Sequence, residues 1–160
     1  MIIRELNKSD ISAVKNIYEL YWTGDFKDNL IKRLNGNIEN SPDVIQQSFK
    51  YFVAENHGEV VGVVGYRNVP QHMIEFTSSD HPAELYIIAV KNKGEGLGKT
   101  LIEKVKDGLK EFKYTEVVLY SGETHKESWG FYDHLGFERV KESVAPNGEK
   151  GQIWRMILEK

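Results

Sequence analysis

The chain has 160 residues, a length typical of one domain. Its 21 Lys and Arg stand against 24 Asp and Glu, a formal net charge of −3, which argues against a dedicated nucleic-acid binder. It contains no cysteine, so disulfide scaffolds, zinc–thiolate sites and thiol nucleophiles are excluded.

The N-terminal sequence Met1-Ile2-Ile3-Arg4 reaches a charge after three residues, so we expect no secretory signal. The longest apolar run, residues 85–90, is far shorter than the roughly 18 residues that indicate a membrane span. We therefore expect a cytoplasmic protein that acts without a membrane.

The first 50 residues predict a strand followed by helices. Residues 2–5 form the strand, and Ser9 or Asp10 caps a helix. Its apolar positions are Ile11, Val14, Ile17, Tyr18 and Tyr21. Residues 22–25 break it, a second helix runs up to residues 35–36, and Pro42 opens a short third helix.

From residue 51 the pattern changes to strands. Residues 51–55 and 59–67 form a hairpin around a turn at 56–58, and residues 84–90 form a strand buried on both faces. A helical stripe over 97–112 follows, then a strand at 116–120 and a helix over 126–135 that Gly136 ends. Two last strands flank residues 146–148, the second covering 152–158. No repeat or linker divides the chain, so the fold class is a single mixed α/β sheet with helices on its faces.

The stretch Lys93-Gly94-Glu95-Gly96-Leu97-Gly98 is the most informative part of the sequence, because it joins the buried strand directly to a helix. Glycines there let the backbone approach a ligand and present consecutive amide hydrogens, and the helix N-terminus favours an anion such as a phosphate. Lys91, Lys93 and Lys99 against Glu95 make this stretch basic. The alternative is a turn that needs glycine only for its shape.

Two nucleotide-binding patterns match this stretch incompletely. The dinucleotide pattern G-x-G-x-x-G has Lys99 in place of its third glycine. The triphosphate pattern G-x-x-x-x-G-K-[ST] finds its end in Gly98-Lys99-Thr100, but its first glycine position is Lys93.

The stretch resembles the pyrophosphate loop of the GNAT superfamily of acetyl-CoA-dependent N-acetyltransferases, with the pattern [RQ]-G-x-G-x-[GA] after a strand. Residues 128–137 include Phe131-Tyr132 and Leu135-Gly136-Phe137, which resemble the family's F-Y-x-x-L-G-F ending. The resemblance implies a single N-acetyltransferase domain over 1–160. It also implies a GNAT-like mixed, mostly antiparallel sheet of about six to seven strands with helices on both faces, and acetyl-CoA as cosubstrate.

The resemblance also implies a set of cofactor-binding residues. These are Ile88, Ala89, Val90, Lys93, Gly94, Glu95, Gly96, Leu97, Gly98, Lys99, His125 and Tyr132. The chain departs from the family pattern at Lys93, where Arg or Gln is usual, and at His125, where Asn is common. The link from Val90 to Lys93 is also about two residues shorter than usual, so the conformation of the loop is open.

Tyr132 has the position of the family's general acid, which protonates the departing thiolate; by periodicity alone it is a helix-face aromatic. The acceptor amine needs a base, and Glu84 is the first candidate because burial raises a carboxyl pKa. The alternative for Glu84 is a solvated carboxylate at the end of a strand. Glu75, Asp80 and His81 are further candidates for the base. Trp22 and Glu75 are candidates for acceptor binding, and Trp22 would bind an amine through a cation–π contact. The other interpretation of Trp22 is a partly buried core position.

The five histidines show no metal-binding spacing, so we expect no metal. The prediction is therefore direct acetyl transfer from acetyl-CoA to a primary amine, on a small molecule or peptide, by a monomer or homodimer. An acyl-CoA-binding module without appreciable catalysis and a nucleotide hydrolase are the alternatives.

Overall fold

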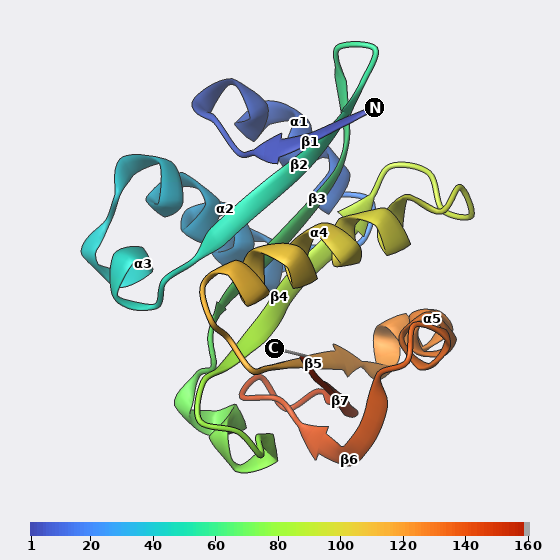
Figure 1. The fold of residues 1–160 in the computed structure, drawn as a ribbon. Coiled ribbons are helices and arrows are strands. Elements are labelled where there is room, and N and C mark those ends of the chain that lie inside the picture. The colour runs from blue at the N-terminus through green and yellow to red at the C-terminus, as the bar shows by residue number, and fades with distance from the viewer. Residues whose placement is uncertain (159–160) are drawn as a thin grey trace. The chain divides into compact units, whose positions relative to one another are not determined.

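The computed structural model describes residues 1–158 (Figure 1). Seven strands are hydrogen-bonded in the order β1-β2-β3-β4-β5-β7-β6, which confirms the predicted mixed, mostly antiparallel sheet. The contacts group the chain into two compact units. The first comprises residues 1–68 and 86–106, and the second comprises residues 69–85 and the chain from Asp107 onward.

Three antiparallel strands build the sheet of the first unit. They are β1 (Ile2–Glu5), β2 (Lys50–Asn56) and β3 (Glu59–Asn68), paired with Ile3 opposite Ala54 and Val53 opposite Val63. His57 and Gly58 both have positive φ in the turn between β2 and β3, as the predicted hairpin requires.

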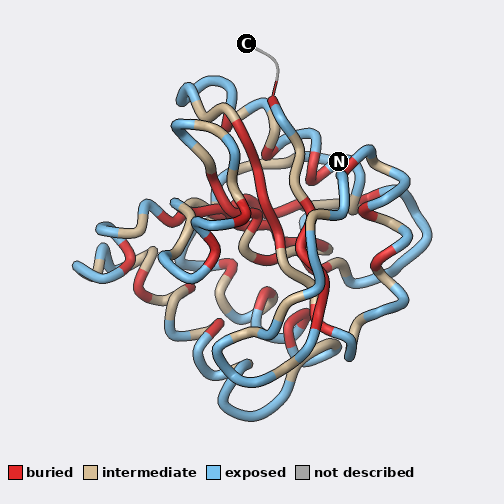
Figure 2. Tube along the Cα trace, turned by 90° about the horizontal axis from the view of Figure 1, so that it is seen from below, coloured by how far each residue is buried: buried red, intermediate tan, exposed pale blue. Residues whose placement is uncertain are grey.

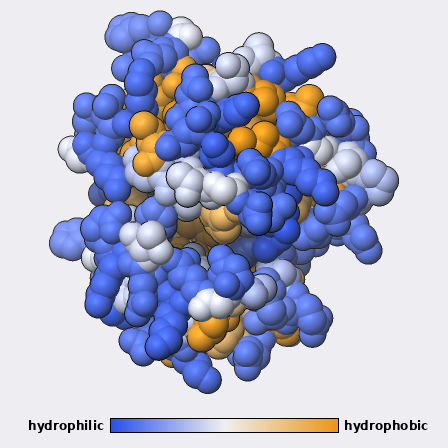
Figure 3. All heavy atoms as spheres, turned by 180° about the vertical axis from the view of Figure 1, so that it is seen from behind, coloured by the Kyte–Doolittle hydropathy of each residue, from blue (hydrophilic) through white to orange (hydrophobic). Residues whose placement is uncertain are grey.

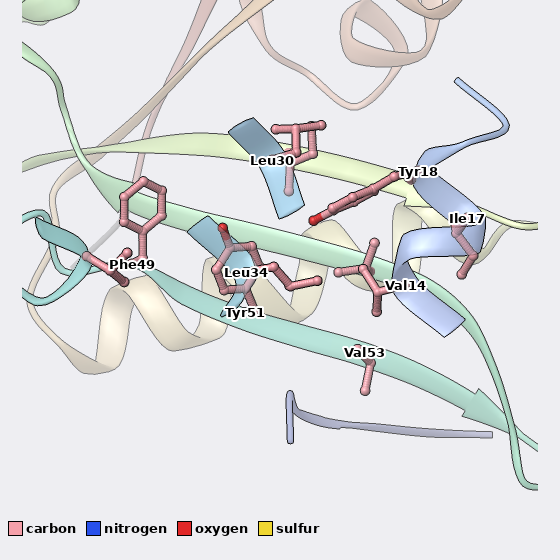
Figure 4. Close-up of a cluster of buried hydrophobic side chains, with 12 residues drawn as sticks. Val14, Ile17, Tyr18, Leu30, Leu34, Phe49, Tyr51 and Val53 are labelled. Atoms are coloured by element: carbon pink, nitrogen blue, oxygen red, sulfur yellow. The ribbon is translucent and has the colours of Figure 1, made fainter. Parts of the chain in front are cut away.

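Three helices precede β2: α1 (Ile11–Tyr18), α2 (Gly24–Glu39) and α3 (Pro42–Gln46). Their apolar faces pack on β2, β3 and β4 in one core (Figure 4). Its buried members are Val14, Ile17, Tyr18, Leu30, Leu34, Val44, Phe49, Tyr51, Val53, Val63, Ile87 and Ala89.

The prediction that the second helix ends at residues 35–36 is wrong, because α2 continues through Gly36 to Glu39. A Cβ on Gly36 would lie 2.7 Å from Ser41 Oγ and 2.8 Å from Val44 Cγ2. The glycine therefore lets α3 approach α2 closely, and Asn40 ends α2 in the left-handed conformation instead.

The cap of α1 also differs from the prediction. Asp10 precedes the helix, but its carboxylate accepts from Asn7 N–H and pairs with Arg4 rather than capping α1. Asn7 accepts from Ser9 N–H and caps a 3₁₀ turn at Lys8–Asp10 that the sequence did not predict.

Two elements, β4 (Pro82–Val90) and α4 (Leu97–Glu111), pass from one unit to the other. Within the first unit, a Cβ on Gly62 of β3 would meet Leu97 and Leu101 of α4, whereas one on Gly65 would meet Tyr51 and Ile87. α4 therefore covers one face of these strands and the core with α1 and α2 covers the other, as predicted (Figure 1).

The second unit contains the 3₁₀ segments at Gln71–Phe76 and Glu123–Ser128, the strands β5 (Glu116–Gly122), β6 (Glu138–Val144) and β7 (Lys150–Ile157), and α5 (Trp129–His134). The first three residues of β4 pair in parallel with Glu116–Val118 of β5. Glu116 is fully buried and accepts from the backbone N–H and hydroxyl of both Ser78 and Ser79. These bonds hold the segment that leads into β4.

Burial is concentrated in β2, β3, β4, β5 and β7, whereas β1 and β6 contain no buried residue and most turns are exposed (Figure 2). The face drawn in Figure 3 is mostly hydrophilic, with separated hydrophobic areas. Among the described residues, no helix has both the length and the apolar composition needed to cross a bilayer.

Candidate functional site

The glycine-rich segment lies in the first unit, between the end of β4 and the start of α4. Gly94 and Gly96 have φ of 84° and 79°, and a Cβ on either would meet no atom within 4 Å. A side chain is thus disfavoured there by backbone conformation, while the space above the backbone is open. The geometry fits the predicted close approach of a ligand to the main chain.

α4 begins directly after this loop. Leu97 is buried and opens a stripe with Leu101, Ile102 and Val105 that fixes the helix on the strands. Thr100 donates from its N–H to Gly96 O at 3.3 Å, which closes the first helical turn on the loop. The N-terminus of a helix carries about half a positive charge, and here it lies immediately after the exposed amides of the loop.

Neighbouring residues fix the start of the loop. The Tyr21 hydroxyl donates to Val90 O at 2.5 Å, and Lys91 N–H donates to Val61 O at 2.8 Å. The Lys91 ammonium pairs with Glu59, and Lys93 Nζ lies 5.0 Å from the centroid of the Tyr21 ring. The role of Tyr21 in holding this loop was not predicted, because Tyr21 and Val90 are 69 positions apart and no local pattern connects them.

A pocket of about 370 Å³ lies beside the loop, between the turn residues Asn56, His57 and Glu59 and the loop residues Lys91, Asn92 and Glu95. Of the predicted cofactor residues, it includes Glu95 and Leu97. The glycine loop is better suited than this pocket to bind an anion, because the loop combines open backbone amides, a helix N-terminus and lysines.

The first unit brings together most of the predicted cofactor residues. Ile88, Ala89 and Val90 end β4, and residues 93–99 follow as the loop and the first turn of α4. Trp22 also lies in this unit, half-buried beside Tyr18, Tyr21 and Phe26 at ring-centroid distances of 5.7, 5.6 and 6.0 Å. Trp22 is therefore partly buried among aromatic residues, which fits the second of the two interpretations of its sequence position, a partly buried core residue.

The second unit contains Glu75, Glu84, His125 and Tyr132. Tyr132 lies in α5, 8% exposed, with its ring 5.2 Å from the Trp154 ring and 6.2 Å from the Phe137 ring. Burial raises the pKa of Tyr132 to about 12, so the phenol is protonated at neutral pH. Asp133, next to Tyr132, accepts from Trp154 Nε1 and from Arg139 and so fixes α5 against the strands.

Glu84 lies inside β4 rather than at its start, because the strand begins at Pro82. Its side chain is only 6% exposed, so the interpretation as a solvated strand-end carboxylate is wrong. The backbone of Glu84 is opposite Val118 of β5.

The three further candidates for the base, Glu75, Asp80 and His81, are exposed. Glu75 lies in the 3₁₀ segment Gln71–Phe76, and Asp80 lies in the turn before β4. His81 Nδ1 contacts Lys113 O at 2.9 Å, and its ring stacks on Tyr114 at 4.0 Å.

His125 has a non-helical backbone within Glu123–Ser128, and its Nδ1 lies 3.8 Å from a Glu127 carboxylate oxygen. Residues 1–158 contain no group of three His, Asp or Glu side chains placed to hold a metal ion.

The chain is similar to a known protein family and to curated proteins. The model of the Acetyltransferase (GNAT) family matches residues 11–137. N-acetyltransferase 8B of Homo sapiens is 30% identical over 111 residues, which is 68% of this chain and 44% of that protein. N-acetyltransferase 8 of Rattus norvegicus is 30% identical over 95 residues, 58% of this chain and 41% of that protein. The chain thus spans less than half the length of these curated relatives.

Solved structures with the same fold cover almost the whole chain. A protein from Desulfovibrio desulfuricans assigned to the GNAT family has a TM-score of 0.82 at 17% identity, with 99% of both chains covered. An aminoglycoside 6'-N-acetyltransferase solved with coenzyme A has a TM-score of 0.73 at 15% identity, covering 100% of this chain and 98% of the other. At these identities the likeness establishes the fold.

Proposed function

Because this chain belongs to the Acetyltransferase (GNAT) family, we propose that residues 1–160 form one N-acetyltransferase domain. This domain transfers an acetyl group from acetyl-CoA directly to a primary amine. Acetyl-CoA supplies the activated acetyl group. The absence of cysteine from the sequence supports direct transfer, since the usual acyl-enzyme nucleophile is missing.

The observation that carries the proposal is the open backbone at Gly94 and Gly96 immediately before α4. The amides of residues 93–98 bind the diphosphate, and the helix N-terminus adds its positive potential. Lys93 and Lys99 add positive charge, and the backbone of Ile88, Ala89 and Val90 binds the pantetheine arm. His125 takes the place of the family's common Asn as a further contact to the coenzyme.

In this proposal, two side chains carry out the proton transfers that the reaction needs. An alkyl ammonium with a pKa near 10.4 is only about one part in 10³ neutral at pH 7, a cost of roughly 4–5 kcal/mol. The buried Glu84 carboxylate accepts the amine proton, and the Tyr132 hydroxyl donates a proton to the departing thiolate. The raised pKa of Tyr132 keeps that proton available at neutral pH. Trp22 and Glu75 contact the acceptor, Trp22 through its ring face.

Calorimetric titration with acetyl-CoA and, separately, with ATP and Mg²⁺ tests the cosubstrate. We expect acetyl-CoA to bind and ATP to show no magnesium-dependent binding. Release of free CoA in the presence of an amine panel then tests transfer. Binding without release for any amine would favour an acyl-CoA-binding module, whereas magnesium-dependent ATP binding would favour a nucleotide hydrolase.

Gly96→Trp tests the loop itself. A bulky side chain at φ 79° fills the open space and strains the backbone, so we expect acetyl-CoA binding to be abolished. Gly148→Trp is the matched control, because Gly148 has a φ of 88°, no atom within 4 Å of a Cβ, and a position in the β6–β7 turn. Normal acetyl-CoA affinity of Gly96→Trp would contradict the assignment of the loop.

A further inference from the structure

The sequence contains two Asn-Gly pairs, Asn35-Gly36 and Asn147-Gly148, and the fold places them in different environments. In such a pair, the backbone nitrogen of the glycine attacks the side-chain carbonyl carbon of the asparagine, because glycine has no side chain to obstruct the approach. Ammonia leaves, a five-membered succinimide forms, and water opens this ring to aspartate or isoaspartate. The local structure decides whether the two groups meet.

Asn147-Gly148 lies in the exposed turn between β6 and β7. Gly148 has a φ of 88°, and a Cβ on it would meet no atom of the described residues within 4 Å. Its backbone N–H donates to Ala145 O at 2.8 Å. Hydrogen bonds in exposed turns open locally at little cost in free energy, so the nitrogen becomes available without unfolding of the second unit.

The Asn147 side chain is turned toward the residues that follow it. Its Oδ1 accepts from the backbone N–H of Glu149 at 3.0 Å. This hydrogen bond closes a ring over Gly148 and so holds the side-chain carbonyl carbon near the Gly148 nitrogen. The same N–H stabilises the negative charge that develops on Oδ1 during the attack, as a backbone donor does in an oxyanion hole.

Asn35-Gly36 lies in the interior of α2 instead, where backbone N–H groups donate within the helix. Gly36 is buried, and a Cβ on it would lie 2.7 Å from Ser41 Oγ and 2.8 Å from Val44 Cγ2. A succinimide holds the backbone of the asparagine outside the helical region, so ring formation at Asn35 requires α2 to unwind. The helix therefore protects this pair.

We propose that Asn147 is a site of spontaneous deamidation, whereas Asn35 is protected in the folded protein. The Gly148 nitrogen bonds to Asn147 Cγ, the Cγ–Nδ2 bond breaks, and the proton of the Gly148 amide leaves with Nδ2 as ammonia. Water then opens the ring, so the reaction needs no enzyme, oxidant or reductant. Aspartate adds a negative charge to the turn, and isoaspartate also lengthens its main chain by one carbon.

The β6–β7 turn is attached to the segment that follows β5. Glu149 O accepts from the Tyr120 hydroxyl at 2.8 Å. The Glu149 carboxylate accepts from the Thr124 hydroxyl and, at 3.4 Å, from Thr124 N–H. A negative charge at position 147 repels this carboxylate, and isoaspartate displaces the backbone of Glu149. We therefore expect deamidation to loosen the attachment of Glu123–Ser128 and to lower the stability of the second unit.

Incubation of the intact protein at mildly alkaline pH, followed by proteolysis and mass spectrometry, tests the site. We expect the peptide with Asn147 to gain about 1 Da, because OH replaces NH₂, and chromatography to separate aspartate from isoaspartate. The peptide with Asn35 is expected to react at least about ten-fold more slowly. An unincubated sample, digested identically, corrects for reaction during proteolysis. No gain at Asn147, or an equal rate at Asn35, overturns the proposal.

The same incubation in urea separates structure from sequence. With α2 unfolded, Asn35 is expected to deamidate at a rate similar to that of Asn147, since both pairs then have the same local sequence chemistry. Continued resistance of Asn35 in urea would show that the helix is not the source of its protection.

Two variants test the effect on stability. We expect the Tm of wild type to fall by about 2 °C or more as Asn147 deamidates. Asn147→Gln removes the reactive pair and is expected to keep its Tm during incubation, whereas Asn35→Gln, the matched control, loses stability as wild type does. An equal fall of Tm in Asn147→Gln, or a constant Tm in fully deamidated wild type, would refute the link between this turn and stability.

Discussion

The phenol of Tyr132 is enclosed by aromatic rings, and this enclosure rather than a neighbouring charge sets its pKa near 12. A protonated hydroxyl suits a proton donor, because at neutral pH it still carries the proton that the departing thiolate takes up as the C–S bond breaks. The same environment makes Tyr132 a packing residue, so a test of its role has to separate chemistry from stability.

Tyr132→Phe keeps the ring and removes the proton. We expect kcat to fall about 10²-fold or more, with little change in the affinity for acetyl-CoA or in Tm. Tyr120→Phe is the control, because burial also raises the pKa of Tyr120 to about 12 while its hydroxyl donates to Glu149 O. Unchanged kcat in Tyr132→Phe, measured by CoA release, would remove Tyr132 as the acid.

At the scale of elements, Asp10 connects β1 to the helices that follow. Its side chain is 3% exposed, and the hydrogen-bonded Arg4 guanidinium lowers the pKa of Asp10 despite the opposing effect of burial. A carboxyl whose pKa is lower in the folded state stabilises the fold above its ordinary value of 3.8. That stability is lost as the pH falls through the folded-state pKa.

Asp10→Asn therefore has a pH-dependent effect on the free energy of unfolding. We expect a loss of about 2 kcal/mol at pH 7 and a much smaller difference from wild type near pH 2, measured by urea denaturation. Asp25→Asn, at an exposed position in the first turn of α2, is the control. An equal deficit at both pH values would show that the ion pair with Arg4 is not the cause.

Local patterns predicted the elements well wherever one segment determines its own structure. The strand, loop and helix over 84–112 follow from an apolar run, adjacent glycines and a helical stripe, and β4 and α4 appear there within two residues of the prediction. The continuation of α2 through Gly36, the burial of Glu84 and the contact between Tyr21 and Val90 depend on tertiary neighbours. No local pattern carries that information.

For the molecule as a whole, charge is unevenly distributed. The chain has a net charge of −3, yet Lys91, Lys93 and Lys99 surround a loop with one glutamate. Neither compact unit is one continuous stretch of sequence, because the chain passes between them after β3, within β4 and within α4. In the proposed function, attraction of the anionic coenzyme therefore depends on local charge and not on the sign of the whole protein.

Ionic strength tests that dependence. Salt screens exposed charges, so we expect the Kd for acetyl-CoA to rise about ten-fold between roughly 0.05 and 0.5 M NaCl. Lys99→Gln is expected to weaken binding at low salt and to reduce this dependence, whereas Lys110→Gln, near the C-terminal end of α4, leaves both unchanged. Calorimetry at several salt concentrations measures the effect, and a Kd independent of salt would argue against electrostatic attraction by the loop lysines.

The contact between Lys93 and Tyr21 gives the protein a built-in optical reporter. An anion that draws the Lys93 ammonium toward the loop removes a charge from the face of the Tyr21 ring, whose centroid is 5.6 Å from that of the Trp22 ring. Trp22 is the tryptophan of the first unit, and Trp129 and Trp154 belong to the second. We therefore expect intrinsic fluorescence to report the proposed binding of the coenzyme without a label, and stopped-flow measurements can follow it before any acceptor has been identified.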